Sequence, residues 1–157
     1  MTPRSAVIVG ALIILDQITK FLVSANLRLY ESLPVLKDVF HITLIHNSGA
    51  AFGLFKGMFP IFIFLSIIVI FLVLLYANRF RHGYSYLKAG LLFILAGTIG
   101  NLIDRIRLGY VIDFIDLRIW PVFNVADTTI TIGGALLIYH ILQGHQNISS
   151  QGHQSTS

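Results

Sequence analysis

Four long apolar stretches alternate with short polar segments along the chain. They cover about residues 5–23, 59–77, 87–103 and 122–142, and the second of them contains no charged residue. A helix that crosses a bilayer needs about 20 mostly apolar residues. We therefore predict an α-helical integral membrane protein with four transmembrane helices, formed by one domain over residues 1–142.

Two polar segments lie outside these spans. Within residues 26–58, the β-branched and aromatic run 39–45 predicts a short strand, and Asn47-Ser48-Gly49 has the composition of a turn. We expect this segment to form a small extramembrane β-cradle on the membrane surface. Residues 143–157 are polar and repeat the sequence Gln-Gly-His-Gln, so we predict a disordered tail whose histidines bind no metal.

Composition supports a membrane protein and excludes several other classes. The chain is 55% apolar and 11% charged, with a mean hydropathy of +0.80. Soluble domains carry about 25% charged residues, so a water-soluble globule or a disordered chain is excluded. The net charge of +4 fits basic residues that flank membrane spans, and we expect no nucleic-acid partner. The absence of cysteine excludes thiol chemistry, and no P-loop or dinucleotide fingerprint indicates a cofactor.

The first span has an alternative interpretation as a cleavable signal peptide. Arg4 precedes an uncharged stretch over residues 5–15, and residues 23–25 resemble a cleavage site. Asp16 and Lys20 would then lie late in the apolar region, where charge is disfavoured. We therefore interpret the stretch as a retained span.

Basic residues give a prediction of orientation. Arg79, Arg81 and Lys88 form a dense cluster near one short loop, and together with Arg4 they favour both termini in the cytoplasm. Other basic residues would then lie outside, so the density of charge in the short loop decides and the total count does not.

Ionisable residues inside the apolar stretches are costly and mark functional or packing sites. Asp16 and Lys20 are four residues apart, so they share a helix face and can form either a functional pair or a packing salt bridge. Asn101, Asp104 and Arg105 share one side of the third span, and we favour an interhelical polar clamp there. Small residues just before them allow a neighbouring helix to approach: Ala96, Gly97 and Gly100.

Asp113 and Asp127 have a different setting. Asp113 lies in an apolar stretch just beyond the third span, and Asp127 lies at the start of the fourth. The link between them is short, so both carboxyl groups can meet at one membrane edge. Two carboxyls that share a site couple, with one protonated and the other ionised, as an aspartyl protease requires. The alternative is that Asn124 or Asp127 caps the fourth helix.

A series of five motifs in this order resembles the bacterial lipoprotein signal peptidase family, also called signal peptidase II. The motifs span residues 16–127 and cover most of the chain outside the tail. They are Asp16-Gln17-x-Thr19-Lys20, Asn47-x-Gly49-Ala50-Ala51-Phe52-Gly53, Gly100-Asn101-x-x-Asp104-Arg105, Val111-x-Asp113-Phe114 and Phe123-Asn124-x-Ala126-Asp127.

The resemblance implies an aspartyl endopeptidase of the bacterial inner membrane, with cytoplasmic termini and an active site near the outer leaflet. Such enzymes cut prolipoproteins just before a cysteine that carries a diacylglyceryl group, and they need no metal. By motif, Asp113 and Asp127 correspond to the catalytic pair. Further matched positions bind substrate or support the site: Asn47, Gly49, Asn101, Arg105 and Asn124. Those expected to be structural are Asp16, Lys20 and Asp104. The implied partners are lipid-modified prolipoproteins and membrane lipid, and we expect a monomer.

Two other function classes compete with a peptidase. A small proton-coupled transporter would use intramembrane carboxylates as a relay. Transporters usually contain internal repeats, and the four stretches show none. A purely structural membrane subunit would use every polar pair for packing, but five polar motifs in 157 residues argue against that role.

Overall fold

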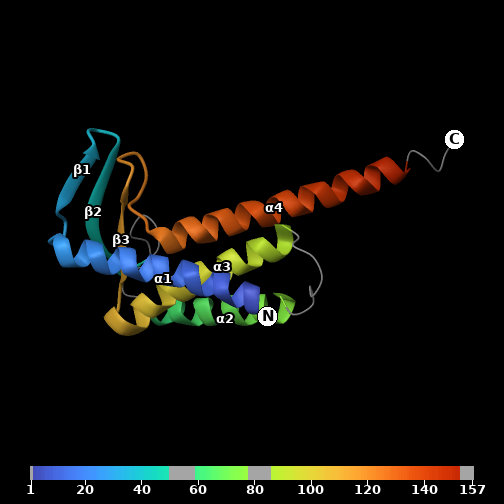
Figure 1. The fold of residues 1–157 in the computed structure, drawn as a ribbon, viewed down its shortest axis with the longest axis horizontal. Coiled ribbons are helices and arrows are strands. Elements are labelled where there is room, and N and C mark those ends of the chain that lie inside the picture. The colour runs from blue at the N-terminus through green and yellow to red at the C-terminus, as the bar shows by residue number, and fades with distance from the viewer. Residues whose placement is uncertain (1, 50–58, 78–85, 153–157) are drawn as a thin grey trace.

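The computed structural model describes residues 2–49, 59–77 and 86–152. Helices run alongside one another, and a small sheet lies across one end of the bundle (Figure 1). In chain order the elements are α1 (Pro3–Asn26), β1 (Ser32–Leu36), β2 (Phe40–Asn47), α2 (Phe59–Ala77), α3 (Tyr86–Leu108), β3 (Val111–Asp116) and α4 (Val125–Gly152).

Three of the helices are long and apolar enough to cross a membrane. They are α1, α3 and the Val125–Gln143 part of α4. Within α2 the apolar helix that the same criteria identify, Pro60–Tyr76, is shorter. The described residues therefore contain three helices of spanning length and one shorter apolar helix, and a fourth complete span stays a prediction.

The helix ends differ from the predicted bounds for local reasons. The third span was predicted to end at residue 103, but α3 continues to Leu108 and so includes Asp104 and Arg105. It ends where Gly109 adopts a φ of 83° and donates its N–H to the Arg105 carbonyl at 3.1 Å. Glycine takes this left-handed conformation without a steric penalty, which makes it a common residue after a helix.

The start and end of α4 also differ from the prediction. The helix begins at Val125 and not at 122, because Phe123 pairs with Ile115 in a β-bridge. At its other end α4 continues to Gly152, whereas the sequence predicts a disordered tail from residue 143. No proline follows Pro121, and extending an existing helix costs far less than starting one.

The central helix of the bundle is α3, which packs against α1, α2 and α4. Its buried Leu92, Leu95 and Ala96 meet Val9 of α1 and Val73 of α2 in the core. Small residues let α3 and α4 approach each other, as predicted, and Gly97 of α3 lies directly against the Ala126 carbonyl of α4. They allow a membrane helix pair to approach closely enough for backbone contact.

The sheet is antiparallel in the order β1-β2-β3. The predicted strand over residues 39–45 is present as β2, whereas β3 was not predicted. Pairing places Asp113 opposite Ile45 and Val111 opposite Asn47. Residues 50–58 of the predicted cradle and the basic residues Arg79 and Arg81 lie outside the described residues.

Candidate active site

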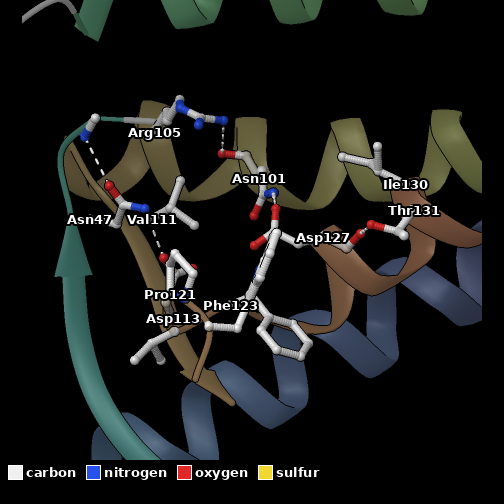
Figure 2. Close-up of a pocket in the computed structure, with 13 residues that line it drawn as sticks. Asn47, Asn101, Arg105, Val111, Asp113, Pro121, Phe123, Asp127, Ile130 and Thr131 are labelled. Atoms are coloured by element: carbon white, nitrogen blue, oxygen red, sulfur yellow. Dashed lines mark hydrogen bonds between the residues drawn. The ribbon is translucent and has the colours of Figure 1, made fainter. Parts of the chain in front are cut away.

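A cavity of about 260 Å³ lies where the sheet meets the ends of α3 and α4. Asp113 and Asp127 both line it, and so do Asn47, Asn101 and Arg105 (Figure 2). The short link between β3 and α4 therefore does bring the two carboxyl groups to one site. Each comes from a different element, β3 for Asp113 and the first turn of α4 for Asp127.

Two asparagine amides hold the carboxyl group of Asp113. Asn47 Nδ2 donates to Oδ2 at 2.8 Å, and Asn124 Nδ2 donates to Oδ1 at 2.7 Å. The side chain is only 2% exposed. Burial, together with the negative charge of Asp127, raises the pKa of Asp113 to about 7. The hydrogen bonds from the two asparagine amides act in the opposite direction and lower this pKa. Asp113 is thus a carboxyl group that can carry a proton near neutral pH.

Asp127 is part of the N-terminal cap of α4. Its Oδ1 accepts from Asn101 Nδ2 at 2.8 Å, and its Oδ2 accepts from the Asn124 backbone N–H at 3.3 Å. In return, Asn124 Oδ1 accepts the Asp127 backbone N–H at 2.8 Å. Capping and a paired-carboxyl site are therefore not exclusive alternatives, because the same residues contribute to both.

Asn124 joins the two halves of the site and is fully buried. Besides Asp113, its Nδ2 lies within hydrogen-bond distance of Asn101 Oδ1, at 3.1 Å, and of the Ile112 carbonyl, at 3.3 Å. One amide thus connects β3, α3 and the start of α4. The sequence identified Asn124 as a candidate but gave no indication of these partners.

The orientation of Asn101 depends on Lys20. Lys20 Nζ donates to Asn101 Oδ1 at 2.9 Å, which leaves the amide NH₂ of Asn101 directed at Asp127. Lys20 also pairs with Asp16 Oδ2 at 2.9 Å and with Asp104 Oδ2 at 2.8 Å. An ammonium has three donors, and all three have an acceptor here. The ion pair between Asp16 and Lys20 that their spacing predicts is therefore present, and Asp104 of α3 also belongs to it.

Further bonds tie this buried network to the rest of the fold. Asp16 Oδ1 accepts the backbone N–H of Ala126, the residue before Asp127, at 2.8 Å. Asp104 accepts from Gln17 Nε2 at 2.9 Å and from the Ile112 N–H at 3.2 Å. The network therefore fixes α1 and α3 relative to both elements that carry the two carboxyl groups. Gln17 lies in the first motif, but sequence reasoning assigned it no role.

Asn101 and Asp104 form the predicted interhelical polar clamp, since both bond Lys20 of α1, whereas Arg105 takes no part in it. Asp104 belongs to the buried network, whereas Arg105 lies at the cavity with its guanidinium 5.3 Å from the centre of the Phe62 ring. Gly49, another predicted site residue, lines the cavity, and its N–H donates to Asn47 Oδ1 at 3.0 Å. That bond directs the Asn47 NH₂ at Asp113.

Trp120 is a cavity residue that sequence reasoning missed. It is the only tryptophan in the chain and lies in the loop between β3 and α4. A single tryptophan next to a proline, between the two acidic motifs, was the available signal. The sequence alone does not indicate that this loop borders the cavity.

Comparisons with known proteins point to one family. The family model described as Signal peptidase (SPase) II matches residues 8–143. The lipoprotein signal peptidase of Halothermothrix orenii is 48% identical over 138 residues, which cover 87% of this chain and 94% of that protein. That of Moorella thermoacetica is 42% identical over 128 residues, covering 82% and 85% of the two chains.

A solved structure agrees as well. A bacterial membrane enzyme determined by the in meso method at 2.3 Å resolution aligns with a TM-score of 0.86 and 31% identity. The alignment covers 92% of this chain and 90% of that one. Together with the apolar helices, this likeness identifies a multi-pass membrane protein. The chain belongs to the signal peptidase II family.

Proposed function

We propose that this chain removes the signal peptide from diacylglyceryl-modified prolipoproteins by cleaving just before the lipidated cysteine. Asp113 and Asp127 are the catalytic pair of this proposal. The observation that carries it is the meeting of the two carboxyl groups in one cavity at the end of the helix bundle. The names of the relatives, lipoprotein signal peptidases, support the substrate class.

The reaction needs one proton shared between the two carboxyl groups. The ionised carboxylate removes a proton from a water molecule as the water oxygen bonds to the scissile carbonyl carbon, and the protonated carboxyl donates to the carbonyl oxygen. The resulting gem-diol then breaks its C–N bond. The leaving nitrogen takes the proton acquired from water, and one diol hydroxyl returns its proton to the other carboxylate. The raised pKa of Asp113 fits a pair that holds one proton at neutral pH.

The remaining predicted residues have positioning roles in this proposal. Asn47 and Asn124 hold Asp113, and Asn101 holds Asp127. Gly49 orients Asn47, and Arg105 lines the cavity. Asp16, Lys20 and Asp104 keep α1 and α3 in place beneath the site.

An apolar hollow of about 340 Å³ lies next to the site and supports the proposal that the substrate is lipid-modified. It extends from Asp127 between α2 and α3, and its lining includes Phe62, Leu65, Val69 and Ile94. A substrate held in the bilayer by its acyl chains and its signal helix can approach the carboxyl groups along such a surface. We further propose a bacterial inner-membrane location, with both termini cytoplasmic and the site near the outer leaflet, and a monomeric enzyme.

The proposal is tested with purified full-length protein in detergent. One substrate peptide carries a diacylglyceryl-cysteine and a matched peptide carries an unmodified cysteine. Wild type is expected to cleave only the lipidated peptide, and Asp113→Asn is expected to cleave neither. Asp38→Asn is the matched control, because Asp38 is an exposed carboxylate in a turn with a φ of 60°, which asparagine tolerates. A folded wild type that cleaves neither peptide would contradict the proposal, and proton flux in sealed vesicles would then be measured.

A further inference from the structure

The loop between β3 and α4 presents apolar side chains to the outside of the molecule. Ile119 is 93% exposed and Trp120 is 61% exposed, and Leu117 next to them is also exposed. Single exposed apolar residues are common on protein surfaces, but a contiguous group marks a surface that contacts protein or membrane. We call residues 117–120 the apolar turn.

Hydrogen bonds hold the apolar turn in one conformation. Asp116 accepts from the Arg118 backbone N–H at 2.9 Å and from the Arg118 guanidinium at 3.0 Å, while Thr43 donates to the same carboxylate at 2.8 Å. Arg118 has a φ of 65°, and the Ile119 N–H donates to the Leu117 carbonyl at 2.8 Å, which closes a γ-turn. A non-glycine residue keeps this backbone conformation only where its surroundings enforce it. These hydrogen bonds therefore fix the turn in the conformation that exposes Ile119.

The apolar turn borders a hollow that it shares with the apolar helix α4. Leu117 and Trp120 border a hollow of about 360 Å³ together with Thr128, Thr131 and Ile132 of α4. Ile132 is seven residues after the start of α4, which corresponds to about 10 Å along a helix axis. The loop after β3 also projects past the side of the bundle that α4 forms (Figure 1). The apolar turn thus borders the same hollow as the first two turns of α4.

Basic residues accompany these apolar side chains. Arg118 is 47% exposed although it pairs with Asp116. The hairpin between β1 and β2 contains the exposed Lys37 and Val39, and it lies at the same end of the sheet, because His41 pairs with Asp116. Tryptophan and basic residues next to apolar ones are typical of the membrane–water interface, where the cation meets anionic headgroups.

We propose that the apolar turn is an interfacial anchor, with Ile119 and Trp120 inserted among the acyl chains of surrounding phospholipids. Arg118 and Lys37 then lie at the level of anionic headgroups. This contact fixes the depth of the sheet, and so of the cavity beneath it, relative to the bilayer. The proposal does not depend on the reaction that the chain catalyses, because the partner is bilayer lipid and not substrate.

The single tryptophan allows a direct test in the unmodified protein. The full chain is reconstituted into vesicles of phosphatidylcholine and phosphatidylglycerol, and Trp120 fluorescence is measured with two kinds of quencher. Lipids brominated near the headgroup end of the acyl chain are expected to quench strongly, and more than lipids brominated near the methyl end. Aqueous iodide is expected to quench several-fold less than it quenches N-acetyltryptophanamide. Trp120→Phe/Phe64→Trp supplies a reference inside the bilayer, since Phe64 is an exposed residue of α2.

Two results would overturn the proposal. Strong iodide quenching without quenching by brominated lipid would place Trp120 in water. Protection from both quenchers would show that protein covers it, such as a second copy of this chain. A variant adds a second measurement: Ile119→Asp is expected to increase iodide quenching at Trp120. Leu33→Asp makes the same change at an exposed residue of the opposite edge strand and is expected to leave that quenching unchanged.

Discussion

Asn124 and Asp127 cap each other at the start of α4. The Asn124 side chain accepts the Asp127 backbone N–H at 2.8 Å, and the Asp127 side chain accepts the Asn124 backbone N–H at 3.3 Å. This is the reciprocal pattern of a capping box, formed here by an asparagine and an aspartate. One Asp127 oxygen is thus held by backbone and the other by Asn101. The same residues therefore cap α4 and position the proposed catalytic carboxyl groups. Mutation can separate the capping role from the positioning role.

Asn124→Ser is expected to keep the helix cap and lose the contact with Asp113. Serine is as good an N-cap as asparagine, so the helix start should be kept, and the free energy of unfolding should fall by about 1–3 kcal/mol because the buried partners of the lost amide are left unpaired. Its hydroxyl is too short to replace the amide bond to Asp113, so the cleavage rate should fall by about tenfold or more. Thermal unfolding in detergent and cleavage of the lipidated peptide measure the two effects. Full activity in this variant would show that Asn124 only caps the helix.

Asp113 makes stability depend on pH with a known sign. Its pKa is about 7 in the folded protein and 3.8 in an unfolded chain, so between these values the folded state binds more protons. Stability from this group is therefore lost as the pH rises from about 4 to about 7. Asp113→Asn has no such titration, so its stability relative to wild type should increase from pH 5 to pH 8, by an amount on the order of a few kcal/mol.

The measurement is the difference in melting temperature between wild type and Asp113→Asn at several pH values in one detergent. Asp38→Asn, which changes an exposed carboxylate, controls for general effects of charge. A difference that is constant across this pH range would show that Asp113 is ionised throughout, which would contradict the raised pKa.

Lys20 balances two buried carboxylates, and its removal should destabilise the fold. Lys20→Met leaves Asp16 and Asp104 without their shared cation, and breaking a buried ion pair costs about 3–5 kcal/mol. Lys20→Met/Asp104→Asn removes one uncompensated charge and should recover part of that loss. The exposed Arg28→Met is the control and should have almost no effect. Equal melting temperatures for Lys20→Met and wild type would contradict the structural role of this network.

Hydropathy was enough to locate the helices, because a long apolar stretch has few structural alternatives. It was less informative about β3, a six-residue strand that pairs with β2, which lies more than 60 positions earlier in the chain. The β-branched and aromatic residues within Val111–Asp116 were the only local sign of this strand. Local sequence does not identify the partner that makes such a short segment a strand.

The candidate site shows the same division between local and long-range information. The meeting of Asp113 and Asp127 could be expected, because only a short link separates their elements. The amide orientations could not. Lys20 contacts Asn101 across 81 positions of sequence, and this bond decides which end of the Asn101 amide faces Asp127. Such contacts depend on how α1 packs on α3, which the spacing of residues on each helix leaves open.

The close approach of α3 and α4 gives the last prediction. A Cβ atom added at Gly97 would collide with the Ala126 carbonyl and lie 2.7 Å from Ile130 Cγ1. Backbone cannot yield as a flexible side chain can, so Gly97→Ala should force α4 away from α3. Overpacking of this kind costs about 1–3 kcal/mol.

Gly97→Ala should also lower the cleavage rate, because Ala126 is adjacent to Asp127 in the first turn of α4. A shift there lengthens the bond from Asn101 to Asp127, and we expect the cleavage rate to fall by at least about tenfold. Gly134→Ala is the matched control in α4, since a Cβ there meets no atom within 4 Å. It should keep full activity and gain up to about 1 kcal/mol, because alanine favours a helix over glycine. If the two variants behave alike in melting temperature and in cleavage rate, the contact between α3 and α4 does not position Asp127.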